Sequence, residues 1–156
     1  MAKRVLVAFF SASGVTRRAA ENIAKATGGD LYEIVPETPY SARDLDWTDK
    51  NSRSTVEMND PDCRPAIASP QPDTAAYDIV FVGFPVWWYV EPRVIDTFLQ
   101  GCDLAGKTIV PFATSGGSGI SGAERRMAEL VPAAEFKRGK LVRGDCSDWA
   151  ISAVRG

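Results

Sequence analysis

Five short stretches of the chain carry the apolar residues expected of β-strands. Near-continuous apolar runs are typical of strands buried on both faces, as in a parallel sheet. The predicted strands are Val5–Phe10, Leu31–Val35, Ile79–Gly83, Thr108–Thr114 and Phe136–Val142. Of these, Leu31–Val35 suits a sheet edge because it contains Glu33 and is followed by Pro36, whereas Ile79–Gly83 is the most apolar and suits the middle. Pro111, within the fourth stretch, fits an inner strand poorly because it has no N–H to donate.

Four segments between or after these strands have apolar residues at the spacing of one helix face. The predicted helices are Thr16–Ala26, a helix within Val90–Gly101, a helix that begins at Ser121, and Ser147–Val154. Pro92 suits the first turn of the second helix, and Ser121 with Glu124 matches a capping box at the start of the third. The alternation of strands and helices predicts an α/β domain whose parallel sheet is covered on both faces.

Residues 36–75 break this alternation. The segment is polar and holds six of the ten prolines, so we expect irregular structure with at most one helix, near Ala42–Asp49. A stretch of this length without regular structure usually has a functional role or is poorly ordered.

The length of 156 residues, 45% of them hydrophobic, suits one domain with a sizeable core, so we treat residues 1–156 as a single domain. Charged and turn-forming residues follow the first apolar run too soon for a signal peptide or a membrane span. The three cysteines are far apart and odd in number, which fits a reducing cytoplasm.

The sequence contains no histidine, and this excludes several kinds of active site. A Ser-His-Asp triad and a Cys-His nucleophile pair both need an imidazole. The cysteine spacing matches no zinc site, and a net charge of −2 gives no sign of nucleic-acid binding. We therefore predict no metal ligand and no catalytic side chain of these kinds.

In a doubly wound sheet, ligands bind beyond the carboxyl ends of the strands, and three loops should meet there: Ser11–Thr16, Pro85–Val90 and Ser115–Gly119. The first runs into a helix and offers backbone N–H groups and hydroxyls that could hold a phosphate dianion without a lysine. An ordinary strand-to-helix turn with serine and threonine caps is the alternative. The loop matches neither G-x-G-x-x-G nor G-x-x-x-x-G-K-[ST], so we do not expect nucleoside triphosphate hydrolysis.

The other two loops suit a flat ligand. Trp87 or Trp88 could stack on a conjugated ring, although both indoles could instead pack on helices. The glycine-rich loop after Thr114 could line the edge of a heterocycle, or could simply be a flexible surface loop. Together the three loops describe a site for a flat ring system with a phosphorylated tail.

These residues resemble the flavodoxin family. The family's first loop, [TS]-x-[TS]-G-x-T, is present as Ser11-Ala-Ser13-Gly14-Val-Thr16, and residues 77–121 contain the motifs G-x-P-x-W-W and G-K-x-x-x-P-F-x-T-x-G-G-S-G of a bacterial short-chain flavodoxin-like branch. With Leu45–Asp60, the resemblance spans nearly the whole chain. It implies a three-layer sandwich with a five-stranded parallel sheet of order 2-1-3-4-5, helices on both faces, and FMN as cofactor. Pro111 is a familiar feature of the fourth strand in that branch.

The resemblance also implies the cofactor-binding residues. They come from the three loops and are Ser11, Ala12, Ser13, Gly14, Val15 and Thr16 for the phosphate, Pro85, Val86, Trp87, Trp88 and Tyr89 beside the isoalloxazine, and Thr114, Ser115, Gly116, Gly117 and Gly119 along the pyrimidine and ribityl chain. The chain departs from the family at Tyr89, where glycine is often found, and in its weakly acidic net charge.

The resemblance implies electron transfer through the bound FMN, with a reductase and an acceptor protein as partners. An NAD(P)H-dependent FMN reductase that acts on quinones or other small acceptors is the second hypothesis. A flavin-free binding module on the same fold is the third. We expect no nucleic acid, no membrane span, and a monomer or weak dimer in the cytoplasm.

Overall fold

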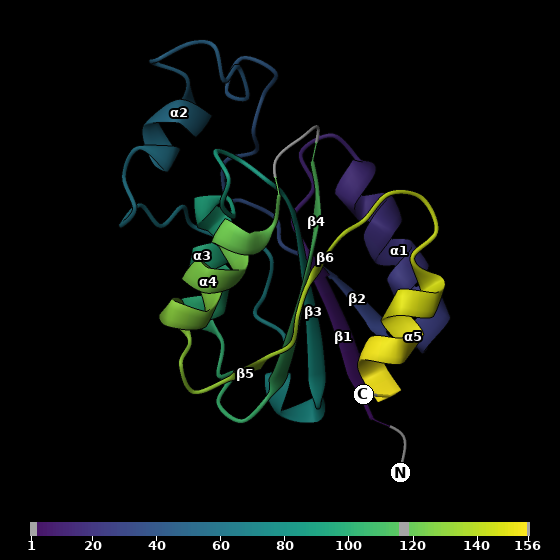
Figure 1. Cartoon of the computed structure of the whole chain (residues 1–156). Helices are drawn as coiled ribbons and strands as arrows, with labels where there is room; N and C mark the ends of the chain where they lie inside the picture. The colour runs from purple at the N-terminus through teal and green to yellow at the C-terminus, as the bar shows by residue number, and fades with distance from the viewer. Residues whose placement is uncertain (1–2, 116–118, 156) are drawn as a thin grey trace.

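A parallel β-sheet lies between two layers of helices in the computed structural model, which describes residues 3–115 and 119–155 (Figure 1). The strands are β1 (Val5–Phe9), β2 (Asp30–Glu33), β3 (Ile79–Pro85), β4 (Thr108–Thr114), β5 (Glu135–Phe136) and β6 (Lys140–Leu141). The helices are α1 (Val15–Thr27), α2 (Arg53–Met58), α3 (Arg93–Gly101), α4 (Ser121–Leu130) and α5 (Ser147–Arg155), with one 3₁₀ turn at Thr74–Ala76. Within these residues, no helix is both long and apolar enough to cross a bilayer.

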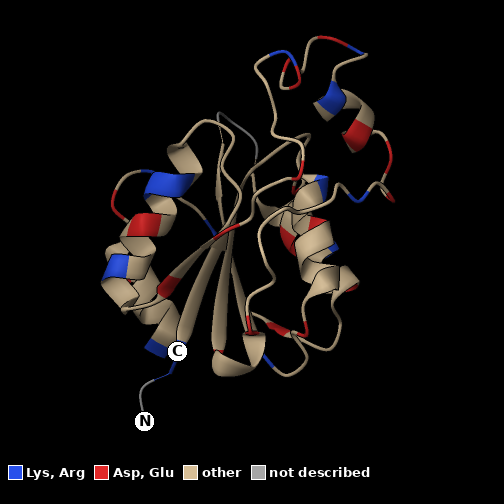
Figure 2. Cartoon of the chain, turned by 180° about the vertical axis from the view of Figure 1, so that it is seen from behind, with Lys and Arg blue, Asp and Glu red and all other residues tan. Residues whose placement is uncertain are grey.

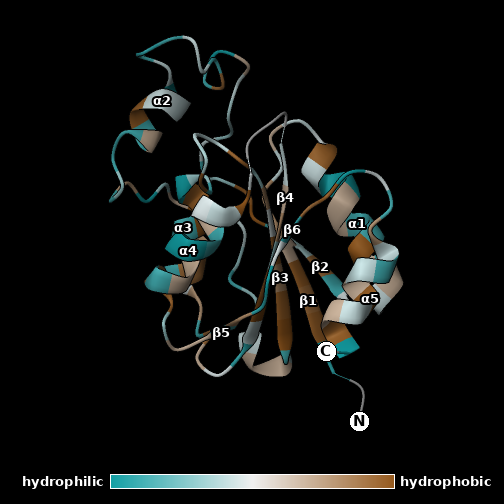
Figure 3. Ribbon diagram, in the orientation of Figure 1, coloured by the Kyte–Doolittle hydropathy of each residue, from teal (hydrophilic) through white to brown (hydrophobic). Residues whose placement is uncertain are grey.

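The strand order is β2-β1-β3-β4-β5, and every pair of neighbouring strands is parallel. This confirms the predicted order 2-1-3-4-5 and the α/β fold. Every residue of β1 is buried, and the sheet strands are the most hydrophobic part of the chain (Figure 3).

Each face of the sheet has its own apolar layer. On one face, α3 and α4 pack over side chains that include Val82, Phe98 and Met127. On the other face, α1 and α5 pack over a second set that includes Ile23, Phe112 and Ala150. The Asn22 side chain of α1 also accepts a hydrogen bond from the Cys146 amide at the start of α5 (2.8 Å), so the two helices are joined by polar as well as apolar contacts.

The predicted fifth strand is interrupted, and this corrects the expectation of one strand over Phe136–Val142. Two strands of two residues each, β5 and β6, pair with β4 at different heights. The carbonyl groups of Ile109 and Ala113 accept hydrogen bonds from this side of the sheet, so Pro111 between them faces the same way. The interruption therefore lies where Pro111 has no N–H to offer, which explains how β4 tolerates a proline.

Two local predictions are wrong. The helix expected near Ala42–Asp49 is instead α2, and residues 42–49 form turns. Ser121 and Glu124 form no capping box, because Ile120 is the N-cap and the Glu124 carboxylate accepts a hydrogen bond from the Gly139 amide (2.7 Å). In both places a contact from elsewhere in the chain outweighs the local signal.

Gly83 allows the centre of the sheet to pack. It pairs with Phe112 across β3 and β4, and a Cβ atom built on Gly83 would lie 2.1 Å from the Phe112 ring. Phe112 is fully buried, so a displaced ring would have to push into the surrounding core.

We expect Gly83→Ala to destabilise the protein by about 1–3 kcal/mol, because the added methyl group overpacks the core. Urea unfolding measures the change. Gly119→Ala is the matched control, since nothing lies within 4 Å of a Cβ there, and it should change stability by less than about 0.5 kcal/mol. Equal unfolding midpoints for the two variants would contradict this packing argument.

Candidate functional site

The three predicted loops meet at the carboxyl edge of the sheet. Thr16 of the first loop shares a buried hydrogen bond with Thr114 at the end of β4 (Oγ1 to Oγ1, 2.8 Å). The Val86 amide of the second loop donates to the Thr114 carbonyl (2.9 Å), and the Phe10 amide donates to the Gly83 carbonyl (3.0 Å). Ser115 is half-buried and Gly119 is exposed, whereas the predicted site residues Gly116 and Gly117 lie outside the described residues.

The first loop closes on itself through Ser11. The Ser11 hydroxyl oxygen accepts hydrogen bonds from the amides of Gly14 (3.0 Å) and Arg17 (3.2 Å). Gly14 precedes the helix with φ of 92°, a left-handed conformation that a side chain would strain. Ser11 therefore shapes the loop and satisfies the third amide of α1, which leaves its first two amides pointing out of the helix end.

The remaining donors of this loop suit an anion. Among the described residues, the amides of Val15 and Thr16 and the hydroxyl of the exposed Ser13 have no hydrogen-bond partner. The α1 dipole adds a favourable potential for negative charge at the same place. The loop can therefore bind a phosphate with uncharged donors.

The two arginines after the loop have partners within the protein. Arg17 pairs with Glu33 on β2 (2.6 Å) and lies over the ring of Phe9. The Arg18 Nε donates to the Gly14 carbonyl (3.4 Å), which ties this side chain back to the loop. Both arginine side chains are therefore held, at least in part, by partners within the protein rather than by the anion site alone.

The second loop is a tight turn with strained backbone. The Trp87 and Val90 main chains exchange hydrogen bonds (3.0 and 3.1 Å). The two residues between them, Trp88 and Tyr89, have φ of 49° and 69°, the pattern of a type I′ turn. Because neither is glycine, the turn stores about 1–3 kcal/mol of strain at each residue, a feature that clusters at binding sites.

Contacts on both sides hold this turn. A Cβ on Gly122 of α4 would lie 2.5 Å from the Tyr89 carbonyl oxygen, so only glycine lets α4 approach the turn. Trp87 is half-buried, whereas the Trp88 side chain is 40% exposed and the Tyr89 side chain 70% exposed. The two indoles therefore differ, and Trp87 lies at the edge of the core while Trp88 faces solvent.

Two aromatic residues that the sequence did not single out complete the surroundings of Trp87. Phe10 and Tyr40 each form an edge-to-face contact with the Trp87 indole. Phe10 lies one residue beyond β1, and its apolar character alone predicted a strand. Tyr40 lies in the polar segment 36–75, where its aromatic character was the only signal that the sequence offered.

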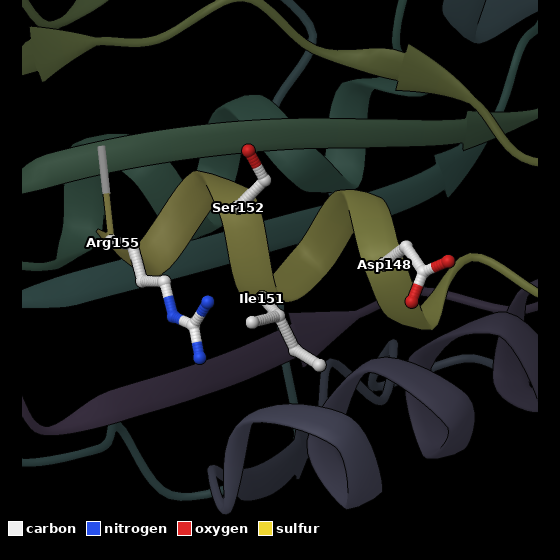
Figure 4. Close-up of a pocket in the computed structure, with 4 residues that line it drawn as sticks. All are labelled: Asp148, Ile151, Ser152 and Arg155. Atoms are coloured by element: carbon white, nitrogen blue, oxygen red, sulfur yellow. The ribbon is translucent and has the colours of Figure 1, made fainter.

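Three hollows differ in their relation to these loops. One of about 560 Å³ is lined by residues that include Val15, Arg18 and Thr114, and a smaller one of about 160 Å³ is lined by Phe10, Ser11, Ala12 and Tyr40 among others. The third, of about 490 Å³, is lined only by Asp148, Ile151, Ser152 and Arg155 of α5 (Figure 4). It lacks buried polar groups, so we place the candidate site at the loops.

Residues 36–75 approach the site through a cluster of buried charges at the start of α3. The part of this segment around α2 lies beyond the carboxyl ends of the strands, on the side of α3 and α4, and carries charges of both signs (Figures 1 and 2). Glu91 and Asp96 are fully buried, and Arg93 is 5% exposed. The Arg126 side chain of α4 lies 3.4 Å from the Glu91 carboxylate and 2.8 Å from the Asp96 carboxylate.

The same arginines hold the end of α2 and the residues after it. Arg93 donates to the carbonyl groups of Glu57 (3.3 Å) and Met58 (2.8 Å). Arg126 and Arg64 both donate to the Pro61 carbonyl (3.0 and 2.9 Å). The buried charges thus attach residues 57–64 to α3 and α4.

Glu91, like Asp96, is fully shielded from solvent. Neither of its carboxylate oxygens has a hydrogen-bond partner within the described chain. Burial, together with the neighbouring Asp96 carboxyl, raises the pKa of Glu91 to about 9. Arg126 favours the charged form, but the loss of water and the second carboxylate outweigh it.

Comparisons with known proteins identify relatives. A sequence model of the family described as "Flavodoxin" matches residues 4–154. A presumed flavoprotein from Bacteroides eggerthii is 50% identical with a TM-score of 0.90, and the comparison covers 98% of this chain and 94% of that one. A presumed flavoprotein from Bacteroides uniformis is 45% identical with a TM-score of 0.92 over all of both chains.

A more distant structure shares the fold. A flavoprotein from Lactobacillus acidophilus, solved in complex with FMN, is 22% identical with a TM-score of 0.80, covering 99% of this chain and all of that one. No curated protein sequence matches the chain closely enough to be counted as a relative.

The raised pKa of Glu91 has a consequence for stability that Glu91→Gln tests. In the unfolded chain this carboxyl ionises near its ordinary pKa of 4.5, but in the folded protein only near 9. Its contribution to stability is therefore complete below pH 4.5 and is lost as the pH rises towards 9. Glutamine stays neutral, so we expect the variant to match the natural protein at pH 5 and to exceed its stability at pH 9 by roughly 2 kcal/mol or more.

Urea unfolding of both proteins at pH 5, 7 and 9 measures this difference. Titrating groups remote from Glu91 are common to the two proteins and cancel, whereas the neighbouring Asp96 and Arg126 side chains also lose their interaction with this carboxyl in the variant. A stability difference that stays constant over this range would show that Glu91 titrates normally.

Proposed function

The chain belongs to the flavodoxin family, and on that premise we propose that it binds FMN at the carboxyl edge of its sheet and transfers electrons through the bound flavin. The observation that carries the proposal is the loop of Ser11–Thr16. Its left-handed Gly14, its two outward amides and its unpartnered Ser13 hydroxyl form an anion site at the start of α1. FMN presents a phosphate dianion to such a site, whereas an uncharged ligand would leave these donors unused.

The residues of the three loops suit the other parts of FMN. Ser13, Gly14, Val15 and Thr16 would hold the phosphate, with Ser11 keeping the loop closed. Pro85, Val86 and the Trp87–Tyr89 turn would flank the isoalloxazine, and Thr114, Ser115 and Gly119 would lie along its polar edge and the ribityl chain. When bound, FMN supplies the redox chemistry, because its ring system takes up and releases electrons.

The residues around the site then set the affinity for FMN and the reduction potential of its ring system. Trp87 offers an aromatic surface to a flat ring, and aromatic contact adds about 0.5–1.5 kcal/mol beyond the burial of surface. The rings of Phe10 and Tyr40 behind it keep the surroundings weakly polar. Such surroundings disfavour negative charge on the ligand ring and lower its reduction potential.

A reductase that takes hydride directly from NAD(P)H is the second candidate. It needs open space beside the ring for a nicotinamide, and the exposed Trp88 and Tyr89 side chains leave one side of the turn facing solvent. Stopped-flow reduction of the FMN-loaded protein by NADPH alone, compared with reduction through a flavodoxin reductase, separates the two functions. Fast reduction by NADPH alone would favour the reductase.

We expect Ser13→Ala to raise the Kd for FMN about tenfold or more, because one hydrogen bond to a charged phosphate contributes about 1.5–3 kcal/mol. Titration of purified protein, followed by the quenching of flavin fluorescence, measures the Kd. Riboflavin, which lacks the phosphate, is the control ligand, and its Kd should not change. A colourless protein that ignores added FMN, or an unchanged Kd in the variant, would count against the proposal.

A further inference from the structure

Tyr40 is in contact with Trp87 although 47 positions separate them in the sequence. The ring centroids of Tyr40 and Trp87 are 5.4 Å apart at an interplanar angle of 77°, and those of Phe10 and Trp87 are 5.7 Å apart at 89°. Tyr40 and Phe10 also touch, at 5.5 Å. Each of the three rings thus contacts the other two, and edge-to-face contacts of this kind favour one orientation of each ring.

Tyr40 is itself held from three directions. Its hydroxyl donates a hydrogen bond to the Glu57 carboxylate of α2, and Glu57 is only 7% exposed. The Arg53 guanidinium lies 3.8 Å from the centroid of the Tyr40 ring, within the range of a cation–π contact. Arg53 also pairs with Glu57 (2.9 Å), so both partners of Tyr40 are bonded to each other.

The helix that carries Arg53 and Glu57 is attached to the body of the protein. Arg53 donates to the Thr38 carbonyl (2.6 Å), two residues before Tyr40. At the other end of α2, the buried Arg93 donates to the carbonyl groups of Glu57 and Met58. A continuous set of contacts therefore runs from the start of α3, through α2 and Tyr40, to the indole of Trp87.

We propose that Tyr40 is a positioning residue that sets the orientation of the Trp87 ring at the flavin site, and that Arg53 and Glu57 hold Tyr40 for this task. The proposal rests on the proposed function, since it gives Trp87 a flavin to meet. A side chain that is already oriented loses less freedom when a ligand binds, so the contact with Tyr40 favours affinity without touching the ligand.

A double-mutant cycle on the FMN Kd tests the proposal. We expect Tyr40→Leu to raise the Kd about threefold to tenfold in the natural protein. In a Trp87→Leu background, the same change should alter the Kd by less than about twofold, because no indole remains to be oriented. A loss of the same factor in both backgrounds would mean that Tyr40 acts without Trp87 and would overturn the proposal, as would an unchanged Kd for Tyr40→Leu.

Tyr32→Leu is the matched control. Tyr32 is also half-buried, shares a hydrogen bond with Ser69 through its hydroxyl and contacts one aromatic ring, Phe98, but it does not touch Trp87. Its replacement should leave the FMN Kd within about twofold of the natural value. An effect as large as that of Tyr40→Leu would reduce the role of Tyr40 to general packing and overturn the proposal.

Tyr40→Phe takes the place of Tyr40→Leu if the latter does not fold. It keeps the ring but leaves Glu57 without its donor, so we expect about a twofold to threefold rise in the FMN Kd, again only when Trp87 is present. No rise, or the same rise without Trp87, contradicts the proposal.

Near-UV circular dichroism of the same proteins without flavin separates this proposal from the proposed function. An oriented indole gives sharp bands in this region, and we expect Tyr40→Leu to weaken them when Trp87 is present and to leave them unchanged in the Trp87→Leu background. If the natural protein fails to bind FMN, the proposed function is wrong, and the spectra still decide whether Tyr40 orients Trp87. Spectra that do not respond to Tyr40 in either background overturn the positioning role.

Discussion

Charged side chains can leave water only where other charges and carbonyl groups replace it, and the start of α3 depends on this condition. Arg93 and Asp96 are almost completely buried, and their partners come from α4 and from residues 57–64. Loss of either partner segment would leave charges buried alone, which is more costly than the loss of an apolar contact. The polar segment around α2 is therefore part of the folded unit, and Trp87 lies only four residues before Glu91.

The strained turn directly precedes this cluster in the chain. Trp88 and Tyr89 keep left-handed backbone conformations that most side chains avoid. Such strain persists where the surroundings determine the backbone from several sides, here through the ring contacts of Trp87, the close approach of Gly122 and the buried start of α3. The backbone of a turn held in this way has little conformational freedom left to lose.

Local apolar patterns predicted most of the strands and four helices, whereas the strand order followed from the resemblance to the flavodoxin family. The meeting of the three loops was predicted because parallel strands end at one edge. The position of α2 was not predictable, since this six-residue helix is stabilised by Arg93 rather than by a long apolar face. Arg93 and Asp96 are polar positions on an amphipathic helix, and nothing in their spacing indicates burial. Tyr40 depends on the same contacts and was missed for the same reason.

The joining of α1 to α5 has a consequence for how the protein is made. The apolar layer on that face contains seven residues from the beginning of the sequence, and Val142, Cys146 and Ala150 from near its end. The seven are Val5, Val7, Phe9, Ala19, Ala20, Ile23 and Ala24. A ribosome releases the chain from its N-terminus, so α1 emerges long before the helix that covers it. Until residues 142–155 have been synthesised, the inner side of α1 and the sheet beneath it stay partly open to water, and exposed apolar surface of this kind favours aggregation of a nascent chain.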